Sequence, residues 1–287
     1  RSWAMNLAMI VTKNCAPLWP PEGFYVLRNL LGANEVSLLH HLIDLHRQQV
    51  PPSRQILYTH QLPPVLTNTS TDTVNGAPIR GMEVLMEQWL NPHRHGTLST
   101  LSVAESLRER IRHLLQSVPV LFQDLLMSKN PGHQPMPFHQ DFPFWPVAEP
   151  VGGVLWVALD SIDQSVGGLS LAAGSHIDGI GPPIDLHSGL PQPGFVCDPI
   201  DLARYTVDTP VLAPGDAIWF HPLLWHRSDA NLSGRQRRVW NSTWLPSQAH
   251  WSRQNAPRHP LANRLQEGSA VGEHGWTPML FDDKERL

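Results

Sequence analysis

The chain is poor in several residue types, and each shortage excludes a class of protein. It has only two cysteines, Cys15 and Cys197, and neither lies in a CxxC or similar spacing, which excludes a disulfide framework and a cysteine-rich metal module. We therefore expect two reduced thiols in a cytoplasmic protein. No apolar run approaches the ~20 residues that a membrane-spanning helix needs, so we expect no membrane partner. The first residues also lack the charged and apolar regions of a signal peptide.

Charge is also scarce. Charged residues make up 16% of the 287 residues, the formal net charge is −4, and no block of Lys and Arg occurs, so we expect no nucleic-acid partner. Proline and glycine, in contrast, are abundant, with 28 and 20 residues spread along the chain. This favours many short elements joined by turns over a long helical bundle. The 11 tryptophans are expected mostly in the core, with a minority available to line an apolar substrate pocket.

The first part of the chain is expected to be largely helical. The apolar spacing predicts helices over residues 34–48, 84–91 and 99–117. Asn34 is the expected N-cap of the first helix, and Ser102 with Glu105 forms a capping box at the start of the third. A strand and turn are expected before these helices, at residues 23–31. Residues 51–80, rich in Pro, Thr and Asn, are expected to be mostly loop with short strand pieces.

The pattern changes after Val118, where short apolar runs alternate with turn signals and predict strands. The runs are VPVLFQDLLMS, PFHQDF, VGGVLWVALD, GGLSLAAGSH, TPVLAPGDAIWFH and RRVWNSTWL. We expect a mainly β fold with flanking helices, a β-barrel or jelly roll, in one domain over 1–287. The helical part would cover about 1–118 and the jelly roll about 119–246. The polar residues 247–287 would form a loosely structured flap or surface segment.

The sharpest chemical signal is the run Phe138-His139-Gln140-Asp141 at the end of a predicted strand. In an extended chain, residues i and i+2 point to the same side, so His139 and Asp141 can bind one metal ion together. A third ligand must come from a distant strand; His226 is the first candidate and His221 is its rival. Two imidazoles and one carboxylate on one face form the facial triad of non-haem Fe(II) oxygenases, which leaves coordination positions open. The alternative is a surface histidine beside a turn aspartate.

A cation follows the distal histidine at a useful spacing. A 2-oxo diacid needs a cation for its distal carboxylate, and the fork of an arginine can bind it with two hydrogen bonds. Arg237 lies on the predicted strand that follows His226, and Ser228 could donate a further hydrogen bond to the same carboxylate. Arg238 should point to the opposite face of the strand, and Arg235 is expected still in the turn. A surface charge cluster is the alternative for all three arginines.

These residues together resemble the phytanoyl-CoA hydroxylase (PhyH) family over about residues 119–246, and more loosely over the helices before them. The resemblance rests on several pieces in order: Ser128–Gly132, Pro137–Asp141 with Phe144–Pro146, Trp156–Asp160, Gly167–Leu169, Gly174–His176, Pro214–Asp216, and His221 through Arg237. The order and spacing of so many pieces make the match specific.

The resemblance implies a double-stranded β-helix, a jelly-roll variant, that uses Fe(II), 2-oxoglutarate and O2. It assigns the iron to His139, Asp141 and His226, and the C5 carboxylate of 2-oxoglutarate to Arg237 and Ser228. It also implies weaker co-substrate roles for Gln123, Gln140 and Trp156. Gln123 lies six residues before Lys129, as a co-substrate-contacting glutamine does in the ectoine hydroxylase branch. An ordinary strand position for Gln123 and a core position for Trp156 are the alternatives. His176 matches a family position that is usually structural.

One residue distinguishes reactions within the family. The halogenating branch has Gly or Ala in place of the carboxylate ligand, whereas this chain has Asp141. We therefore expect hydroxylation of an unactivated C–H bond in a small organic molecule, in secondary metabolism, with desaturation, epimerisation or cyclisation as alternatives. A non-catalytic cupin-like binding protein and a zinc hydrolase are further alternatives. Phe142, Phe144, Trp145 and Trp225 favour an apolar or aromatic substrate, unless they pack in the core.

Overall fold

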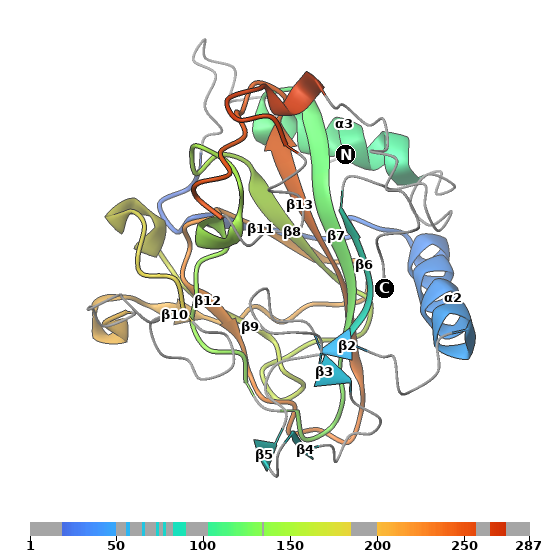
Figure 1. The fold of residues 1–287 in the computed structure, drawn as a ribbon. Helices are drawn as coiled ribbons and strands as arrows, with labels where there is room; N and C mark the ends of the chain where they lie inside the picture. The colour runs from blue at the N-terminus through green and yellow to red at the C-terminus, as the bar shows by residue number, and fades with distance from the viewer. Residues whose placement is uncertain are drawn as a thin grey trace.

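Two antiparallel sheets form the body of the protein (Figure 1). The computed structural model describes residues 19–49, 56–57, 65–66, 73–74, 77–78, 83–89, 103–133, 135–184, 200–256 and 265–273. The larger sheet has the spatial order β1 (Phe24–Leu27), β11 (Ala217–Phe220), β8 (Gly153–Ala158), β13 (Arg237–Pro246), β7 (Pro119–Lys129), β6 (Glu83–Trp89), β2 (Ile56–Leu57) and β3 (Val65–Leu66). The smaller sheet has the order β10 (Val207–Asp208), β9 (Leu169–Ala172) and β12 (His226–Ser228), and β4 (Thr73–Val74) pairs with β5 (Ala77–Pro78). The predicted mainly β fold is confirmed.

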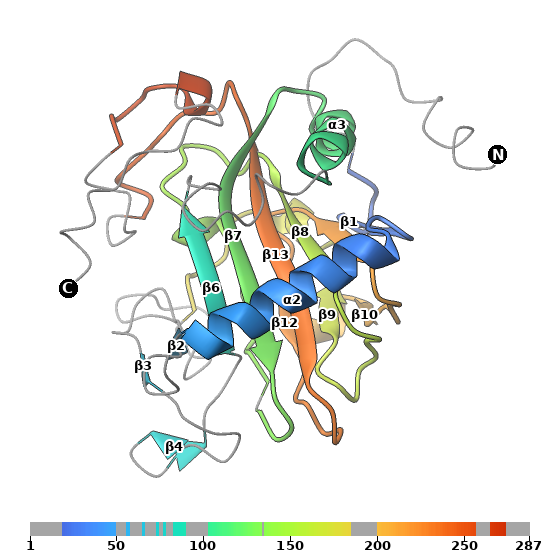
Figure 2. The same ribbon diagram turned by 90° about the vertical axis from the view of Figure 1, so that its right-hand side faces the viewer.

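Helices α2 (Ala33–Gln49) and α3 (Val103–Leu115) cover the outer face of the larger sheet, as Figure 2 shows. An apolar cluster joins the two helices to that face. It includes Leu39 and Ile43 of α2, Leu107 and Ile111 of α3, and Leu155, Val157, Trp240 and Trp244 of the strands. Full burial of such a side chain contributes about 1.5–3 kcal/mol. The helices therefore hold the outer face in place and leave the inner face to the site. Four short 3-10 helices complete the described elements: η2 (Phe142–Phe144), η3 (Ser175–Asp178), η4 (Leu202–Arg204) and η5 (Val271–Glu273).

The helix predicted at residues 34–48 is confirmed as α2, but its expected N-cap is wrong. The helix begins one residue earlier, and the carbonyl of Gly32 accepts the N–H groups of Glu35 and Val36. The Glu35 carboxylate in turn accepts the Gly32 N–H at 2.6 Å, which is the carboxylate half of a capping box. Asn34 lies inside the first turn instead. The helix predicted at 99–117 is confirmed as α3, while Ser102 lies outside the described residues.

The helix predicted at residues 84–91 is wrong, because this segment forms strand β6. It pairs antiparallel with β7, from Glu83 opposite Ser128 to Trp89 opposite Gln123. The segment EVLMEQW is rich in helix-forming residues, but pairing with a long neighbouring strand satisfies its backbone groups as fully as a helix would, and tertiary context overrides the local preference. With β1 and β6 in the larger sheet, the first 118 residues are not a purely helical part.

The tail from Ser247 packs more closely than its polar composition suggests. Trp251, Leu265 and Val271 belong to the inner apolar cluster, with exposed fractions of 3% or less. The backbone N–H of Val271 also donates to Ala249 O at 2.7 Å. A few apolar anchors therefore hold residues 247–256 and 265–273 against the jelly roll, in contrast to the expected loose segment. The rest of the tail lies outside the described residues.

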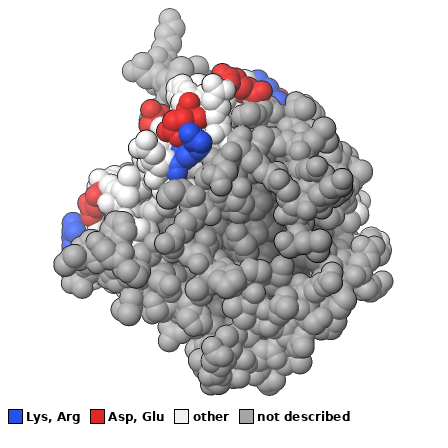
Figure 3. Space-filling model, viewed as in Figure 1, with Lys and Arg blue, Asp and Glu red and all other residues white. Residues whose placement is uncertain are grey.

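In the small described areas of the face seen in Figure 3, blue and red side chains adjoin. Ion pairs of partly exposed side chains include Arg204 with Asp178 and Arg253 with Glu267. None of the helices in the described ranges is long and apolar enough to cross a membrane. Cys15 and Cys197, the two expected free thiols, lie outside the described residues.

Candidate metal and co-substrate site

His139 and His226 face each other across a backbone bridge between two distant segments. The N–H of His139 donates to His226 O at 2.9 Å, and the N–H of His226 donates to His139 O at 3.0 Å. His226 begins β12, whose other neighbour is β9. The bridge therefore aligns the run containing His139 along the smaller sheet, and it holds the two imidazole rings 4.3 Å apart between centroids.

Both imidazole rings are oriented by the same local hydrogen bond. Nδ1 of His139 lies 2.8 Å from Pro137 O, and Nδ1 of His226 lies 2.9 Å from Leu224 O. A carbonyl can only accept, so each Nδ1 carries the hydrogen and each Nε2 has a free lone pair. The Nε2 atoms of His139 and His226 lie 3.5 and 3.7 Å from Oδ1 of Asp141. One ligand atom from each of the three residues lies within 4.8 Å of the others.

The site keeps His226 in the form that a metal requires. Burial, followed by the nearby His139, lowers the pKa of His226 from 6.5 to about 4. The ring of Phe220 packs on it with centroids 4.6 Å apart. A neutral imidazole is the form that ligates, so His226 is ready to bind at neutral pH. Within the described residues, no other group of three His, Cys, Asp or Glu side chains converges in this way.

The rival ligand His221 does not join this group. Its Nδ1 accepts the Leu223 N–H at 3.0 Å, and its ring packs 5.0 Å from His176 and 5.2 Å from Trp19. Burial and the neighbouring His176 lower the pKa of His221 to about 3. His221 is thus a neutral packing residue at the end of β11, apart from the triad.

Arg237 is a fully buried cation, 0% exposed. None of its three guanidinium nitrogens has a hydrogen-bond partner in the part of the chain that the structure describes. Its guanidinium carbon lies 5.3 Å from the centroid of the Trp156 ring, a cation–π distance. Burial lowers the pKa of Arg237 from 12.5 to about 9, so the group stays charged at neutral pH. A buried charge without a partner is costly, and an anionic ligand would remove that cost.

Lys129, which the sequence analysis did not assign to the site, lies directly beside Arg237 in the β7–β13 register. It is 0% exposed, and its Nζ donates to Ser228 Oγ at 2.9 Å and to Asp229 O at 2.6 Å. Gly167 makes room for its stem, because a Cβ there would lie 2.6 Å from Lys129 Cδ. Burial, and then the charge of Arg237, lower the pKa of Lys129 well below 10.5.

Lys129, Arg237 and Ser228 together form what we call the cation cradle. Because Lys129 already donates to the hydroxyl oxygen of Ser228, the hydroxyl hydrogen of Ser228 remains available to an acceptor. Ser228 and His226 are both buried on β12, two residues apart, which corresponds to about 6.8 Å along a strand. A short diacid bound to the triad at one end would reach the cradle at the other.

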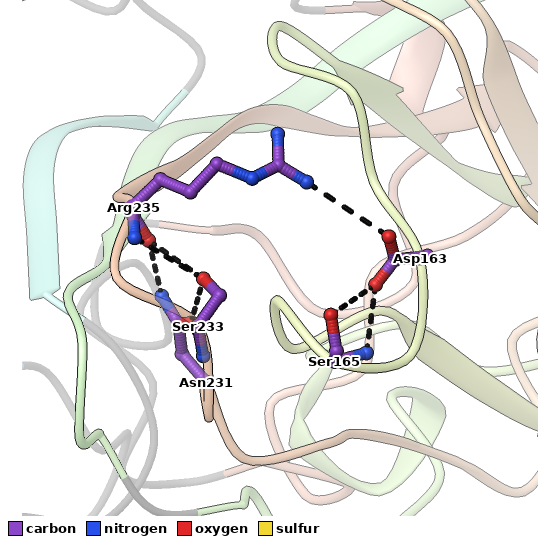
Figure 4. Close-up of polar contacts among 5 residues, drawn as sticks. All are labelled: Asp163, Ser165, Asn231, Ser233 and Arg235. Atoms are coloured by element: carbon purple, nitrogen blue, oxygen red, sulfur yellow. Dashed lines mark hydrogen bonds and ion pairs between the residues drawn. The ribbon is translucent and has the colours of Figure 1, made fainter.

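Arg238 and Arg235, the competitors of Arg237, are engaged elsewhere. Arg238 points to the opposite face of β13 and grips Asp160 with Nε and NH2 at 3.0 and 2.7 Å. Arg235 extends along the surface toward Asp163, 3.8 Å away, with 53% of its side chain exposed (Figure 4). The turn that carries Arg235 is fixed by Asn231, whose amide donates to Arg235 O and Lys129 O, both at 2.8 Å. Asn231 therefore also anchors the backbone of the cradle.

The three weaker candidates differ in where they lie. Trp156 contacts the guanidinium of Arg237, as described. Gln123 is buried in β7, opposite Thr243 of β13. Gln140, in contrast, is directed away from the triad. Its amide nitrogen donates to Gly179 O and Leu223 O, and its Oε1 accepts the N–H of Gly181. Gln140 therefore joins the loop at residues 179–181 to the segment that contains Leu223. The structure does not bring it to the co-substrate position.

The aromatic residues near the triad are packed in cores. Phe142, Phe144 and Trp145 belong to the inner apolar cluster and are 3 to 6% exposed. Trp225 belongs to a separate cluster with Phe138 on the smaller sheet. Their proximity to the ligands in the sequence therefore reflects core packing, and it gives no support to an aromatic substrate.

The fold and the triad together define an oxygenase-type site, and a comparison of the sequence with family models identifies the family. The phytanoyl-CoA dioxygenase (PhyH) model matches residues 21–239. The chain belongs to this family of non-haem iron- and 2-oxoglutarate-dependent oxygenases, as the sequence analysis predicted. No curated protein sequence matches the chain significantly.

Three solved structures illustrate the likeness of fold. The 2-oxoglutarate-dependent carbocyclase SnoK from nogalamycin biosynthesis is 15% identical, with a TM-score of 0.63 over 92% of this chain and 94% of that one. The epimerase SnoN, in complex with Fe3+, alpha-ketoglutarate and nogalamycin RO, is 17% identical, with a TM-score of 0.63 over 87% and 91%. EctD from S. alaskensis, with 2-oxoglutarate and 5-hydroxyectoine, is 18% identical, with a TM-score of 0.58 over 86% and 82%. At these identities the likeness establishes the jelly-roll fold.

Proposed function

We propose that this protein is an Fe(II)- and 2-oxoglutarate-dependent hydroxylase of a small organic molecule, with His139, Asp141 and His226 as the iron ligands. The observation that carries the proposal is the convergence of three ligand atoms within 4.8 Å. Both imidazoles are oriented by backbone carbonyls. Ligands that are fixed before the metal arrives lose little freedom on binding it.

The donor set fits iron. Two neutral imidazole nitrogens and one carboxylate oxygen are the ligands of the facial triad, and they leave room for a bidentate 2-oxo acid and O2. Bound Fe(II), with 2-oxoglutarate and O2, supplies the oxidising power that breaks a C–H bond, while 2-oxoglutarate becomes succinate and CO2. The residues of the chain orient the reactants and exclude water. His139, Asp141 and His226 serve as ligands, and none of them is asked to move a proton.

The cation cradle suits the C5 carboxylate of 2-oxoglutarate. Arg237 supplies a guanidinium fork that has no hydrogen-bond partner among the described residues, and a carboxylate is the group that such a fork binds with two parallel hydrogen bonds. Ser228 supplies a hydroxyl hydrogen, and Lys129 holds the Ser228 hydroxyl in place. Trp156 packs on the guanidinium of Arg237 and limits where the carboxylate can lie. Gln123 remains a candidate contact on the neighbouring strand.

Hydroxylation is favoured by Asp141, since the halogenating relatives lack a carboxylate at this position. A second candidate reaction is ring closure or epimerisation, because two of the compared structures are a carbocyclase and an epimerase. Product mass separates the three outcomes. A hydroxylated product gains one oxygen atom, a cyclised or desaturated product loses two hydrogen atoms, and an epimer keeps its mass. The compared structures contain a nogalamycin and a hydroxyectoine, which favours a small metabolite as the substrate.

We also propose that the chain acts as a single catalytic unit in the cytoplasm. Strands β1 and β6 from the first 118 residues join the larger sheet, and Trp251 and Val271 from the tail join the inner cluster. Both flanking parts would therefore be needed for a stable site. The scarcity of cysteine supports a reducing compartment.

The test is an oxygen-free titration of the Fe(II)-loaded protein with 2-oxoglutarate, recorded in the visible spectrum. We expect a weak metal-to-ligand charge-transfer band that saturates with one equivalent of bound 2-oxoglutarate. Metal content, measured separately, should fall in His139→Ala and Asp141→Ala, and the band should disappear with it. Bound iron without a band would reject the oxygenase, and it would favour a cupin-like binding protein or a zinc hydrolase.

A further inference from the structure

Asn241 lies on the inner face of the larger sheet, in the middle of β13. Alternate residues of a strand share a face, and Arg237 and Val239 mark the inner face of this one, because Val239 belongs to the inner apolar cluster. Asn241 follows two residues later. Its register partners are Trp156 of β8 and Leu125 of β7, which both belong to the same inner cluster. Asn241 is thus a polar residue in an apolar part of the wall.

The amide oxygen of Asn241 has no partner among the described residues. Oδ1 is buried and accepts no hydrogen bond from any group in the part of the chain that the structure describes. Buried polar atoms in folded proteins are nearly always paired, and an exception calls for a cause. Of the two register partners, Leu125 has no side-chain donor, and the indole N–H of Trp156 makes no hydrogen bond to this oxygen. A bound molecule can supply one.

The register places Asn241 between the level of the metal and the level of the cation cradle. Phe220, whose ring packs on His226, is in register with Val154 of β8, and Val154 is in register with Thr243 of β13. Asn241 lies two residues from Thr243 toward Arg237. Its side chain therefore belongs to the stretch of wall that faces bound reactants.

Oδ1 of Asn241 can accept a hydrogen bond from only one of the two reactants. At neutral pH, 2-oxoglutarate has two carboxylates and a ketone, which all accept hydrogen bonds and donate none. It cannot satisfy an amide oxygen. The organic substrate can, provided that it carries an O–H or N–H group.

We propose that Asn241 is a specificity-determining residue that accepts a hydrogen bond from a hydroxyl or N–H group of the organic substrate. The proposal rests on the proposed function, since it assumes that a substrate binds beside the triad and the cradle. It narrows the substrate class to molecules with a donor close to the reacting carbon, and it excludes plain hydrocarbon chains. A single well-placed polar group in an apolar wall is the usual way in which a pocket fixes the orientation of its ligand.

The experiment uses two probes with the same ring, cyclohexanol as a donor and cyclohexanone as an acceptor only. Each is titrated into oxygen-free protein loaded with Fe(II) and 2-oxoglutarate, and the perturbation of the charge-transfer band gives its dissociation constant. We expect wild-type protein to bind cyclohexanol roughly five- to tenfold more tightly than cyclohexanone, the range that one net hydrogen bond supports. Asn241→Leu, of similar volume, should abolish this preference. Asn241→Asp, which retains acceptor oxygens, should preserve it.

The outcomes separate the two proposals. If wild-type protein with bound iron gives no band with 2-oxoglutarate, the proposed function fails, and the assignment of Asn241 fails with it. If the band forms but the two probes bind equally, or the preference survives in Asn241→Leu, only the assignment of Asn241 is overturned. A large loss of 2-oxoglutarate affinity in Asn241→Leu, with thermal unfolding unchanged, would also overturn it, because Asn241 would then serve the co-substrate.

Discussion

Arg237 and Arg238 are consecutive residues of one strand, and they differ in almost every physical respect except their covalent structure. Arg238 faces outward, where Asp160 accepts hydrogen bonds from its Nε, its NH2 and its backbone N–H. Arg237 faces inward, is fully buried, and has no hydrogen-bond partner for its guanidinium among the described residues. The pKa of Arg238 is raised, first by its hydrogen bond to Asp160, whereas burial lowers the pKa of Arg237.

On the proposed function, Arg238 serves the fold and Arg237 serves a ligand. A paired, half-exposed arginine stabilises the state in which it is paired. An unpaired buried arginine destabilises the empty protein and becomes favourable only when an anion arrives. Alternation along the strand keeps the two roles on opposite faces of one sheet, so each can be altered without touching the other.

The largest expected effect is that of Arg237→Leu on co-substrate binding. Removal of the inward cation should weaken 2-oxoglutarate roughly 100-fold or more, as expected when one partner of a buried charged pair is lost. The free energy of unfolding of the empty protein should not fall, because the substitution removes an unpaired buried charge. Calorimetric titration with 2-oxoglutarate and urea unfolding give the two numbers. A clear loss of stability with unchanged affinity would reverse the roles assigned to the two arginines.

Arg238→Leu is the matched control: it should lower stability and leave the affinity for 2-oxoglutarate nearly unchanged. It leaves the half-buried carboxylate of Asp160 without its main partner, so the free energy of unfolding should fall by about 1–3 kcal/mol. The affinity for 2-oxoglutarate, measured on the folded protein, should change by less than about threefold. A drop in affinity as large as that of Arg237→Leu would show that the outer pair acts through the sheet on the cradle.

A smaller effect is expected when the cradle is disturbed from the turn that precedes β9. Gly167 has φ +84°, and a Cβ there would lie 2.6 Å from Lys129 Cδ and 2.9 Å from Asp229 O. Gly167→Ala should displace Lys129 from Ser228 and weaken 2-oxoglutarate roughly tenfold, as for the loss of a supporting contact. Gly234→Ala is the control, because a Cβ at Gly234 meets nothing within 4 Å. Equal affinities in the two variants would exclude a role for Lys129 in orienting Ser228.

The smallest effect is a pH dependence that Lys129 should impose on co-substrate binding. Burial, and then Arg237, hold the pKa of Lys129 below its ordinary value in the empty cradle, and a bound carboxylate would raise that pKa again. Binding then takes up a proton, so affinity should increase as pH falls toward the lowered pKa, by at most about tenfold per pH unit for one proton. Lys129→Met should flatten the profile. Dissociation constants over a pH series provide the measurement, and an unchanged slope in Lys129→Met would refute the assignment.

The parts of the site that the sequence predicted share one physical origin. His139 with Asp141, and the choice of Arg237 over Arg238, both follow from the two-residue period of a strand, which requires no knowledge of the neighbours. Lys129 could not be recognised in this way. Its burial depends on the space left by Gly167, and its role depends on its register beside Arg237. Both facts join residues that are far apart in the chain.

The errors in the fold have a similar cause. The residues of β6 favour a helix locally, but pairing with the edge of β7 decides their conformation. The tail beyond Ser247 was predicted as loose because its composition is polar, yet Trp251 and Val271 are almost completely buried. Asn34 was assigned as a cap by residue type, whereas Gly32 and Glu35 form the cap that the helix uses. Local signals fail where the deciding contact is distant or where two residues compete for one role.

The three-residue strand β12 carries both a proposed iron ligand, His226, and a proposed co-substrate contact, Ser228. His226 and Ser228 lie on one face of the strand. Arg227 between them forms an ion pair with Asp229, with Nε 2.8 Å from Oδ1. Deletion or insertion of one residue between them would place His226 and Ser228 on opposite faces of the strand. On the proposed function, a change of length within β12 would separate the iron ligand from the co-substrate contact, whereas a point substitution would alter one of them alone. Length variation among descendants of this chain should be found in the turns on either side of β12 and not within it.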